Sequence, residues 1–327
     1  MKKFYFLSLI LVSTLGFSQV SLPYYESFNY TDASNLGGQG NWVNVNSGDE
    51  VLVQAGNLSY SGLQASTGNS VAFDGLGVDP QLTITSQTSN EVFASFIIKV
   101  TDVTAATNAN GGYFFGFGSN ATTFSSTVWL KQNGTQFNIG LDKNTSTTNF
   151  VFDTTDYSIN SEIFIVISYD FTTNTSKMWI NPVSTSLGIA TAPTATLTAS
   201  TGTDRTSIDR IFIRQDSVSE TPFIVLDETR VGNSWADVTP VATASTKNFD
   251  AIAGLKMYPN PVTGNVLNIS STANLDMNVA IFDVLGKQVI NTKVTNNTVN
   301  VSSLNAGVYI VKVTEDGKTA TRKLVVN

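Results

Sequence analysis

Short runs of alternating apolar and polar residues, separated by clusters of Gly, Asn, Asp, Ser and Thr, constrain this fold most. They begin at Leu22, and no stretch sustains the 3.6-residue period of a helix. In residues 91–100 the alternate apolar residues share one strand face: Val92, Ala94, Phe96, Ile98 and Val100. Ile97 makes the opposite face partly apolar. We therefore expect an all-β protein in which this strand is covered on both sides.

Two hairpins follow from the same pattern. Asn133-Gly134 favours a type I′ turn, and apolar residues alternate before it and again at residues 137–141. Residues 163–169 alternate before a turn at 172–175, after which Met178 and Ile180 face inward. About a dozen such strands over roughly 200 residues predict one large jelly-roll sandwich.

The amino terminus has the three parts of a secretory signal peptide. Lys2 and Lys3 form the positive region, residues 4–12 the apolar region, and residues 16–18 the cleavage region. We expect residues 1–18 to be removed after Ser18. The apolar run is too short to span a bilayer, so we expect no membrane span in the mature chain.

Three further boundaries complete the expected organisation. Residues 19–238 form the jelly-roll domain, and residues 239–253 are small and polar without alternation, as in a linker. Residues 254–327 contain a second, smaller set of strands of the size of an immunoglobulin-like β-sandwich.

Composition excludes several classes of function. The chain has no Cys and no His, which rules out disulfides, thiolate chemistry, Ser-His-Asp triads and His-ligated zinc. Eighteen Lys and Arg against 25 Asp and Glu give a net charge of −7, so nucleic acid is not an expected partner. Any catalysis would rest on carboxylates, Lys or Tyr.

Four landmarks occur in order at the end of the chain. They are residues 255–261 with Tyr258, Pro259, Asn260 and Pro261, residues 279–287 with Gly286 and Lys287, residues 304–313 with Gly307, Tyr309 and Lys312, and the basic strand at 321–326. This pattern resembles, residue for residue, the type A sorting domain read by the type IX secretion system of Bacteroidetes. The resemblance implies a secreted protein whose partners are the secretion machinery and its sortase. It also implies removal of the sorting domain, with the mature protein at the outer-membrane surface or in the extracellular space.

The larger domain carries weaker family motifs. Residues 226–238, residues 174–181 and the opening residues 25–30 resemble strands of concanavalin A-like (laminin G-like) jelly rolls in secreted bacterial proteins. That fold hosts lectins, glycan-binding modules, hydrolases and inert spacers, so the resemblance implies fold more than function. We interpret the domain as a non-catalytic module that binds a glycan or another cell-surface polymer, or that adheres without a small ligand.

Three tryptophans are the candidate ligand-binding residues: Trp42, Trp129 and Trp179. Sugar binding uses aromatic faces together with amide and carboxylate groups. Trp129 and Trp179 are out of phase with apolar neighbours such as Leu130 and Met178, which is compatible with a solvent-facing position, but packing under a loop or against the second sheet is the favoured interpretation for each. We assign Trp235 to the core.

A carboxylate-dependent polysaccharide hydrolase or lyase is the alternative function. Hydrolases of this superfold present two facing carboxylates, typically on a Glu-x-Asp-x-x-Glu strand, and the sequence contains no such strand. In Asp227-Glu228 neighbouring strand residues point to opposite faces. We expect Asp227 to bond the backbone at a strand end and Glu228 to lie on the surface near Arg230.

Calcium is the one cofactor that the laminin G-like resemblance brings into consideration, held by loop oxygens. The oxygen-bearing loop residues are Asp74, Asp79, Asp102, Asn108 and Asn110. Their spacing matches no defined calcium loop, so we expect solvated side chains and no metal site.

Overall fold

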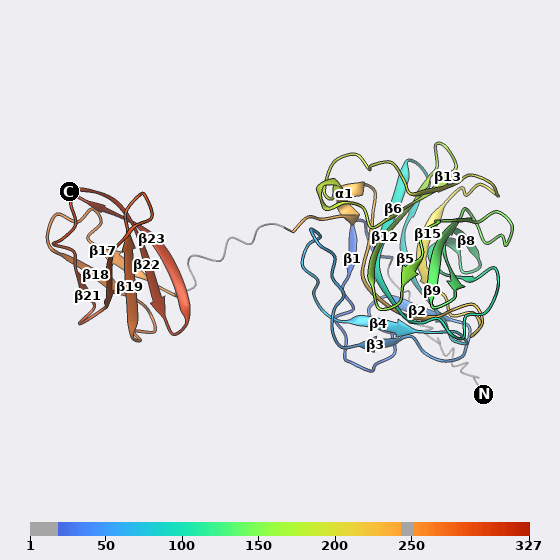
Figure 1. The fold of residues 1–327 in the computed structure, drawn as a ribbon, viewed down its shortest axis with the longest axis horizontal. Helices are drawn as coiled ribbons and strands as arrows, with labels where there is room; N and C mark the ends of the chain where they lie inside the picture. Colours follow the sequence, from blue (N-terminus) through green and yellow to red (C-terminus); the bar gives the residue numbers. More distant parts are fainter. Residues whose placement is uncertain (1–18, 243–251) are drawn as a thin grey trace, which may run out of the picture. The chain divides into compact units, whose positions relative to one another are not determined.

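The computed structural model describes residues 19–242 and 252–327, and these fall into two compact units that divide between residues 242 and 243 (Figure 1). The predicted signal peptide at residues 1–18 lies outside the described residues. Each unit is a β-sandwich, and the described residues include only one short α-helix, α1 (Trp235–Val238), and one 3-10 turn, η1 (Ser184–Ser186). The expected large jelly-roll sandwich followed by a small immunoglobulin-like sandwich is confirmed.

Two eight-stranded antiparallel sheets build the large unit. The first sheet has the order β14 (Leu197–Ala199), β13 (Thr175–Ile180), β12 (Glu162–Asp170), β6 (Glu91–Asp102), β16 (Phe223–Gly232), β4 (Ser70–Phe73), β3 (Leu52–Gln54), with β1 (Tyr24–Glu26) beside β16. The second sheet has the order β10 (Val151–Phe152), β9 (Gln136–Asp142), β8 (Thr123–Asn133), β7 (Gly112–Asn120), β15 (Ile208–Ile213), β5 (Asp79–Gln87), β2 (Trp42–Val45), with β11 (Tyr157–Ser158) beside β9.

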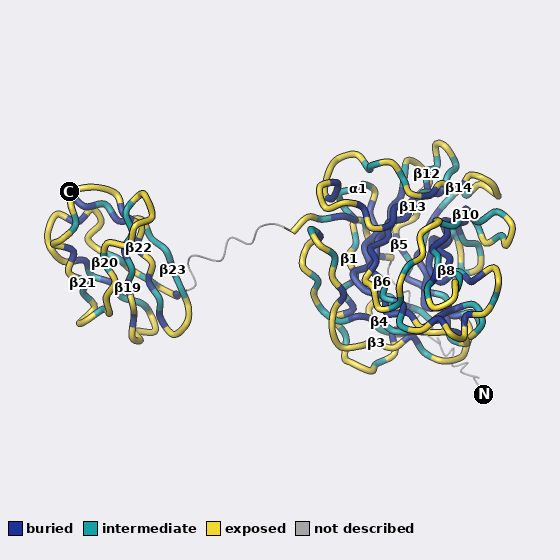
Figure 2. The backbone as a smooth tube through the Cα atoms, in the orientation of Figure 1, coloured by how far each residue is buried: buried dark blue, intermediate teal, exposed yellow. Residues whose placement is uncertain are grey.

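Strand β6 shows how the sequence pattern creates two apolar layers. Its residues Val92, Ala94, Phe96, Ile98 and Val100 lie in the core between the sheets, as predicted. Phe93 and Ile97 point to the opposite face, where a second apolar cluster with Trp179, Trp235 and Leu187 covers them. Figure 2 shows the central strands of this unit buried along their length. The outer face of the first sheet is thus closed by loops.

The predicted hairpins form, with one difference in the turn. Asn133 still pairs with Gln136, so the two-residue loop is Gly134 and Thr135. Gly134 has φ 63° at the first central position, as in a type II′ turn, so the expectation of type I′ was wrong. Met178 and Ile180 face the core after the second turn, as expected.

The small unit contains two sheets around its own core. One has the order β17 (Lys256–Tyr258), β18 (Val266–Ser270), β21 (Thr298–Asn300), and the other β20 (Gln288–Lys293), β19 (Met277–Phe282), β22 (Gly307–Glu315), β23 (Lys318–Val326). Alternate residues of β22, Tyr309, Val311 and Val313, lie in the core between these sheets.

The described ends of the predicted linker are attached to the two units. Thr239 is buried, its hydroxyl donates to the Trp235 carbonyl, and Val241 forms a bridge with Leu63. Ile252 is buried in the small unit. Residues 243–251 lie outside the described part of the chain.

Candidate functional site

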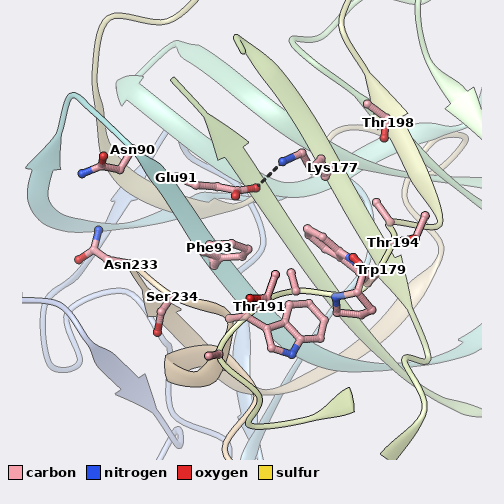
Figure 3. A pocket seen from close by; sticks show the side chains of 15 residues that line it. Asn90, Glu91, Phe93, Lys177, Trp179, Thr191, Thr194, Thr198, Asn233 and Ser234 are labelled. Carbon is pink, nitrogen blue, oxygen red and sulfur yellow. Dashed lines mark hydrogen bonds and ion pairs between the residues drawn. The ribbon is translucent and has the colours of Figure 1, made fainter. Parts of the chain in front are cut away.

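A cavity of about 590 Å³ lies on the outer face of the first sheet and is the candidate site (Figure 3). Its lining comes from the start of β6, from Lys177 and Trp179 of β13, from Thr198 of β14, from the loop at residues 190–195, and from the residues at the start of α1. We call it the Trp179 cavity.

Three aromatic side chains, Phe93, Trp179 and Trp235, form the floor of the Trp179 cavity. The ring centroids of Trp179 and Trp235 are 5.0 Å apart in an edge-on arrangement, and Phe93 lies 6.1 Å from Trp179. Both indole N–H groups donate to loop carbonyls, Trp179 to Pro193 at 2.8 Å and Trp235 to Ser186 at 2.7 Å. The floor is therefore held in one orientation, because neither indole can rotate without losing its acceptor.

An ion-pair network forms one wall. Lys177 lies two residues before Trp179 on the same strand face, and its Nζ is 3.1 Å from Glu91 and 3.4 Å from Asp170. The hydroxyl of Ser168 donates to Glu91 at 2.6 Å. Burial opposes the charged form of Lys177, but hydrogen bonds and charges from Glu91 and Asp170 outweigh it and raise the pKa of Lys177.

The rim carries polar groups that are open to a ligand. Within residues 19–242, the side chains of Asn90, Thr191 and Thr194 are exposed and have no hydrogen-bond partner in the protein. Asn233 donates from Nδ2 to Gln87 at 2.7 Å, which leaves its Oδ1 open. Amide and hydroxyl groups above a fixed aromatic floor suit a ligand rich in hydroxyl groups.

All three candidate tryptophans are buried in the structure. Trp129 and Trp179 are each 3% exposed, which agrees with the favoured interpretation that both are packed and not with the solvent-facing alternative, and of the three candidates only Trp179 lines the Trp179 cavity. Trp42 is fully buried inside the sandwich, and Trp235 is in the core as predicted. Outer-face position did not mean exposure, because loops and neighbouring aromatic rings cover both sheets.

An aromatic row covers Trp129 on the outer face of the second sheet. Its members are Tyr113, Phe124, Trp129, Phe150, Phe152 and Phe212, with neighbouring centroids 4.2–6.2 Å apart. Gly140 permits this packing, since a Cβ there would lie 2.8 Å from the Phe152 ring. Arg214 and Lys131 lie over the faces of Tyr113 and Phe152. Neighbouring rings and the two cationic side chains thus cover most of the ring faces in this row.

Strand β16 carries three buried ionisable side chains, Asp227, Glu228 and Arg230. Asp227 accepts from the backbone N–H of Leu58 at 2.8 Å, while Glu228 accepts from Thr67 N–H at 3.1 Å and pairs with Arg230. A bulge between Asp227 and Arg230, with φ 55° at Glu228, breaks the strand alternation. The backbone bonding of Asp227 is confirmed, but Glu228 is fully buried, so its expected surface position was wrong.

A second, polar hollow of about 300 Å³ is lined by Asp79, Arg214 and Asp216. Burial raises the pKa of Asp79 to about 6. A hydrogen bond with Asp216, assisted by burial, raises the pKa of Glu220 to about 7. Titratable groups held near neutrality are one mark of a functional site, although structural networks produce them too.

Three of the five residues considered for calcium have side-chain oxygens that accept hydrogen bonds from the protein. Asp79 accepts from Gln215 and Asn46, Asp102 from Thr104, and Asn108 from Asn110. Among the described residues, no group of three or more acidic side chains is arranged to hold a metal ion.

The sorting-motif residues brace the small unit or mark its turns. Asn260 accepts from Val325 N–H at 2.9 Å and donates to the Lys323 carbonyl at 2.8 Å, which joins the Tyr258-Pro259-Asn260-Pro261 opening to β23. The Tyr309 hydroxyl donates to the Asn305 carbonyl at 2.9 Å. Gly286 has φ 82° in the turn before β20, where the N–H of Lys287 donates to Asp283. Gly307 opens β22, and Lys312 is exposed on it.

Sequence reasoning missed most of the Trp179 cavity. The shared face of Lys177 and Trp179 was readable from their spacing, but Glu91, Asn90 and Asn233 come from distant segments. The pairing of β12 with β6 and with β13 brings Glu91 to Lys177, and the pairing of β16 with β6, which sets Gly232 opposite Phe93, brings Asn233 to the same place.

The fold and these surfaces define a two-module β-sandwich protein with a compact carboxyl-terminal module. Residues 256–327 match the family model of the secretion system C-terminal sorting domain. This domain indicates export by type IX secretion to the cell surface or extracellular space. In residues 19–242 and 252–327, no helix is both long and apolar enough to cross a membrane.

Solved structures give only distant similarity. The receptor-binding domain of a botulinum neurotoxin C/D mosaic serotype is 14% identical with a TM-score of 0.36, covering 82% of this chain and 65% of that domain. A SAP-like pentraxin from Limulus polyphemus is 14% identical with a TM-score of 0.33, covering 56% and 81%. A Trypanosoma rangeli sialidase is 9% identical with a TM-score of 0.34, covering 60% and 32%. Similarity this distant supports no inference of shared function. No curated protein matches the chain significantly.

Proposed function

We propose that the large domain is a non-catalytic module that binds a glycan or similar hydroxyl-rich polymer in the Trp179 cavity. One observation carries this proposal: a rigid aromatic floor lies under a rim of unpaired amide and hydroxyl groups. The volume of about 590 Å³ falls in the range of small-molecule sites, which suits a few sugar units of a longer chain.

The rim supplies more of the binding than the floor does. Trp179 is only 3% exposed, so it offers an edge rather than a full stacking face. Asn90, Asn233 and Thr191 therefore provide the direct hydrogen bonds, and the floor sets their spacing. Each neutral hydrogen bond contributes about 0.5–1.5 kcal/mol, so a monovalent site of this kind binds weakly.

The small unit supports a matching cellular role. We propose that the secretion machinery reads it after transport across the inner membrane and that a sortase cuts within residues 243–251, between the two compact units. The sequence there shows no strand alternation, which suits a cleavage site. The released or surface-attached large domain then meets polymers outside the cell.

Glycan-array binding of the chain from Gln19 onward tests the proposal. The double variant Asn90→Ala/Asn233→Ala should lose at least tenfold in affinity, while Asn29→Ala, an exposed amide outside the cavity, should bind like the unmodified protein. Equal binding by all three proteins would place the ligand elsewhere. Absence of binding to any glycan would leave adhesion without a small ligand.

A carboxylate-dependent hydrolase or lyase is the second candidate, favoured by the hollow with Asp79 and Asp216. A carboxyl group with a pKa of about 6 beside a second carboxylate is suited to proton transfer. Release of reducing ends from a polysaccharide panel, abolished by Asp79→Asn, would establish this activity. Identical signals from the unmodified protein and buffer would reject it.

A further inference from the structure

We propose that the Trp179 cavity selects neutral glycans and disfavours chains that carry uronate, sulfate or sialate groups. This inference rests on the proposed function and adds the chemical class of the ligand. It is carried by the distribution of charge at the cavity.

The ion-pair network leaves the cavity wall with an excess of negative charge. Lys177 is the single cation of the lining, and it pairs with two carboxylates, Glu91 and Asp170. Two carboxylates against one ammonium give a local net charge of −1. An anionic sugar placed at the rim therefore meets net repulsion rather than an open cation.

Lys177 is also poorly placed to accept an anionic ligand. Two of its three ammonium protons point to carboxylate oxygens, at 3.1 and 3.4 Å. An incoming carboxylate could accept only the third proton, where it would lie beside both partner carboxylates and be repelled by their like charge. A hydroxyl group, in contrast, accepts the third proton without this repulsion.

The net charge of the surrounding domain is negative as well. Residues 19–242 contain 8 Lys and Arg against 20 Asp and Glu, a net charge of −12. Residues 256–327 contain 7 against 4, a net charge of +3. Removing the sorting domain would thus leave the cavity in a strongly acidic module, which slows the approach of polyanions at low salt.

A glycan array with neutral, uronate-containing, sulfated and sialylated members tests the selectivity. Neutral chains should bind about three- to tenfold more tightly than acidic chains with the same backbone, as one net charge at close range predicts. The difference should shrink between 20 and 500 mM NaCl, with neutral binding unchanged. Tighter binding of acidic members would overturn the inference while leaving the proposed function intact, and no binding to any member would overturn the proposed function itself.

Paired variants assign the selectivity to the wall. Glu91→Gln, which keeps the shape and removes one charge, should reduce the neutral-over-acidic ratio at least threefold. Glu162→Gln removes an equal charge outside the cavity and should leave the ratio unchanged. Equal ratios in both variants would show that the wall does not select, and an unchanged urea unfolding midpoint of Glu91→Gln would show that the domain remains folded.

Discussion

The indole N–H of Trp42 donates a 3.0 Å hydrogen bond to the carboxylate of Glu26, inside the apolar core of the large sandwich. The hydroxyls of Tyr24 and Tyr30 and the N–H of Phe28 donate to the same carboxylate. Glu26 is 4% exposed, so these donors replace its hydration. The motif around residues 25–30 thus closes one end of the core.

Replacing Glu26 with Ala should lower the free energy of unfolding by about 3–5 kcal/mol, because buried donors lose a charged acceptor. Urea unfolding of the chain from Gln19 onward, followed by tryptophan fluorescence, measures this. Glu162→Ala, whose carboxylate is exposed, should change stability by less than about 1 kcal/mol. A similar loss in both variants would contradict the assignment.

Stability should fall as pH rises from about 4 to 8. Burial raises the pKa of Asp227 to about 8, so the folded state holds a proton that the unfolded state has released, and raising the pH then favours unfolding. The slope from this group is at most about 1.4 kcal/mol per pH unit. Asp227→Asn should flatten the profile in urea titrations between pH 4 and 9.

Asp102→Asn is the matched control for that titration, since Asp102 lies at an exposed strand end. It should keep the slope of the unmodified protein between pH 5 and 9. A slope that survives in Asp227→Asn would mean that Asp79 and Glu220, whose pKa values are also raised, account for it.

Trp129→Ala and Trp179→Ala should both destabilise the large domain, by about 3–5 kcal/mol, because both rings are buried. Their effects on glycan binding should differ. Trp179→Phe should weaken binding, since the bond to the Pro193 carbonyl is lost, whereas Trp129→Phe should leave binding unchanged. Equal binding by the two Phe variants would argue against the Trp179 cavity.

Deleting residues 255–327 should retain the protein in the periplasm of a host with type IX secretion, since the signal peptide directs only the first crossing. Fusing residues 252–327 to a periplasmic reporter should export the reporter. Fractionation with immunoblotting checks both. Surface exposure of the truncated protein, or secreted material that still contains Asn327 by intact mass, would contradict export with cleavage.

Asn260→Ala should reduce export of the same fusion. It removes both bonds to β23, a loss of about 1–2 kcal/mol from the small unit. Asn265→Ala changes an exposed amide in the same unit and should be exported normally. Normal export of Asn260→Ala would show that these bonds are not needed for sorting.

Period-two patterns made much of the fold predictable, because a strand that is buried on one face must alternate. Strands β6, β9 and β12 confirm this. The exposed fraction of each side chain was less predictable. Phe150 packs on Trp129, and residues 187–193 cover Trp179, and both come from other segments of the chain. The Trp179 cavity depends on such distant segments, so only Trp179 among its residues was a candidate beforehand.

The bulge in β16 adds one residue to the strand and thereby reverses which residue numbers, odd or even, face the core. Before it, odd-numbered Val225 lies in the outer cluster and even-numbered Leu226 in the sandwich core; after it, odd-numbered Val231 lies in the core. The extra residue thus lets one strand present Val225 and Arg230 to the same side. Excising Glu228 alone would remove the bulge but leave Arg230 opposite Ser95 and Val231 opposite Ala94, so both side chains would keep their faces and only the contacts of Glu228 itself would be lost.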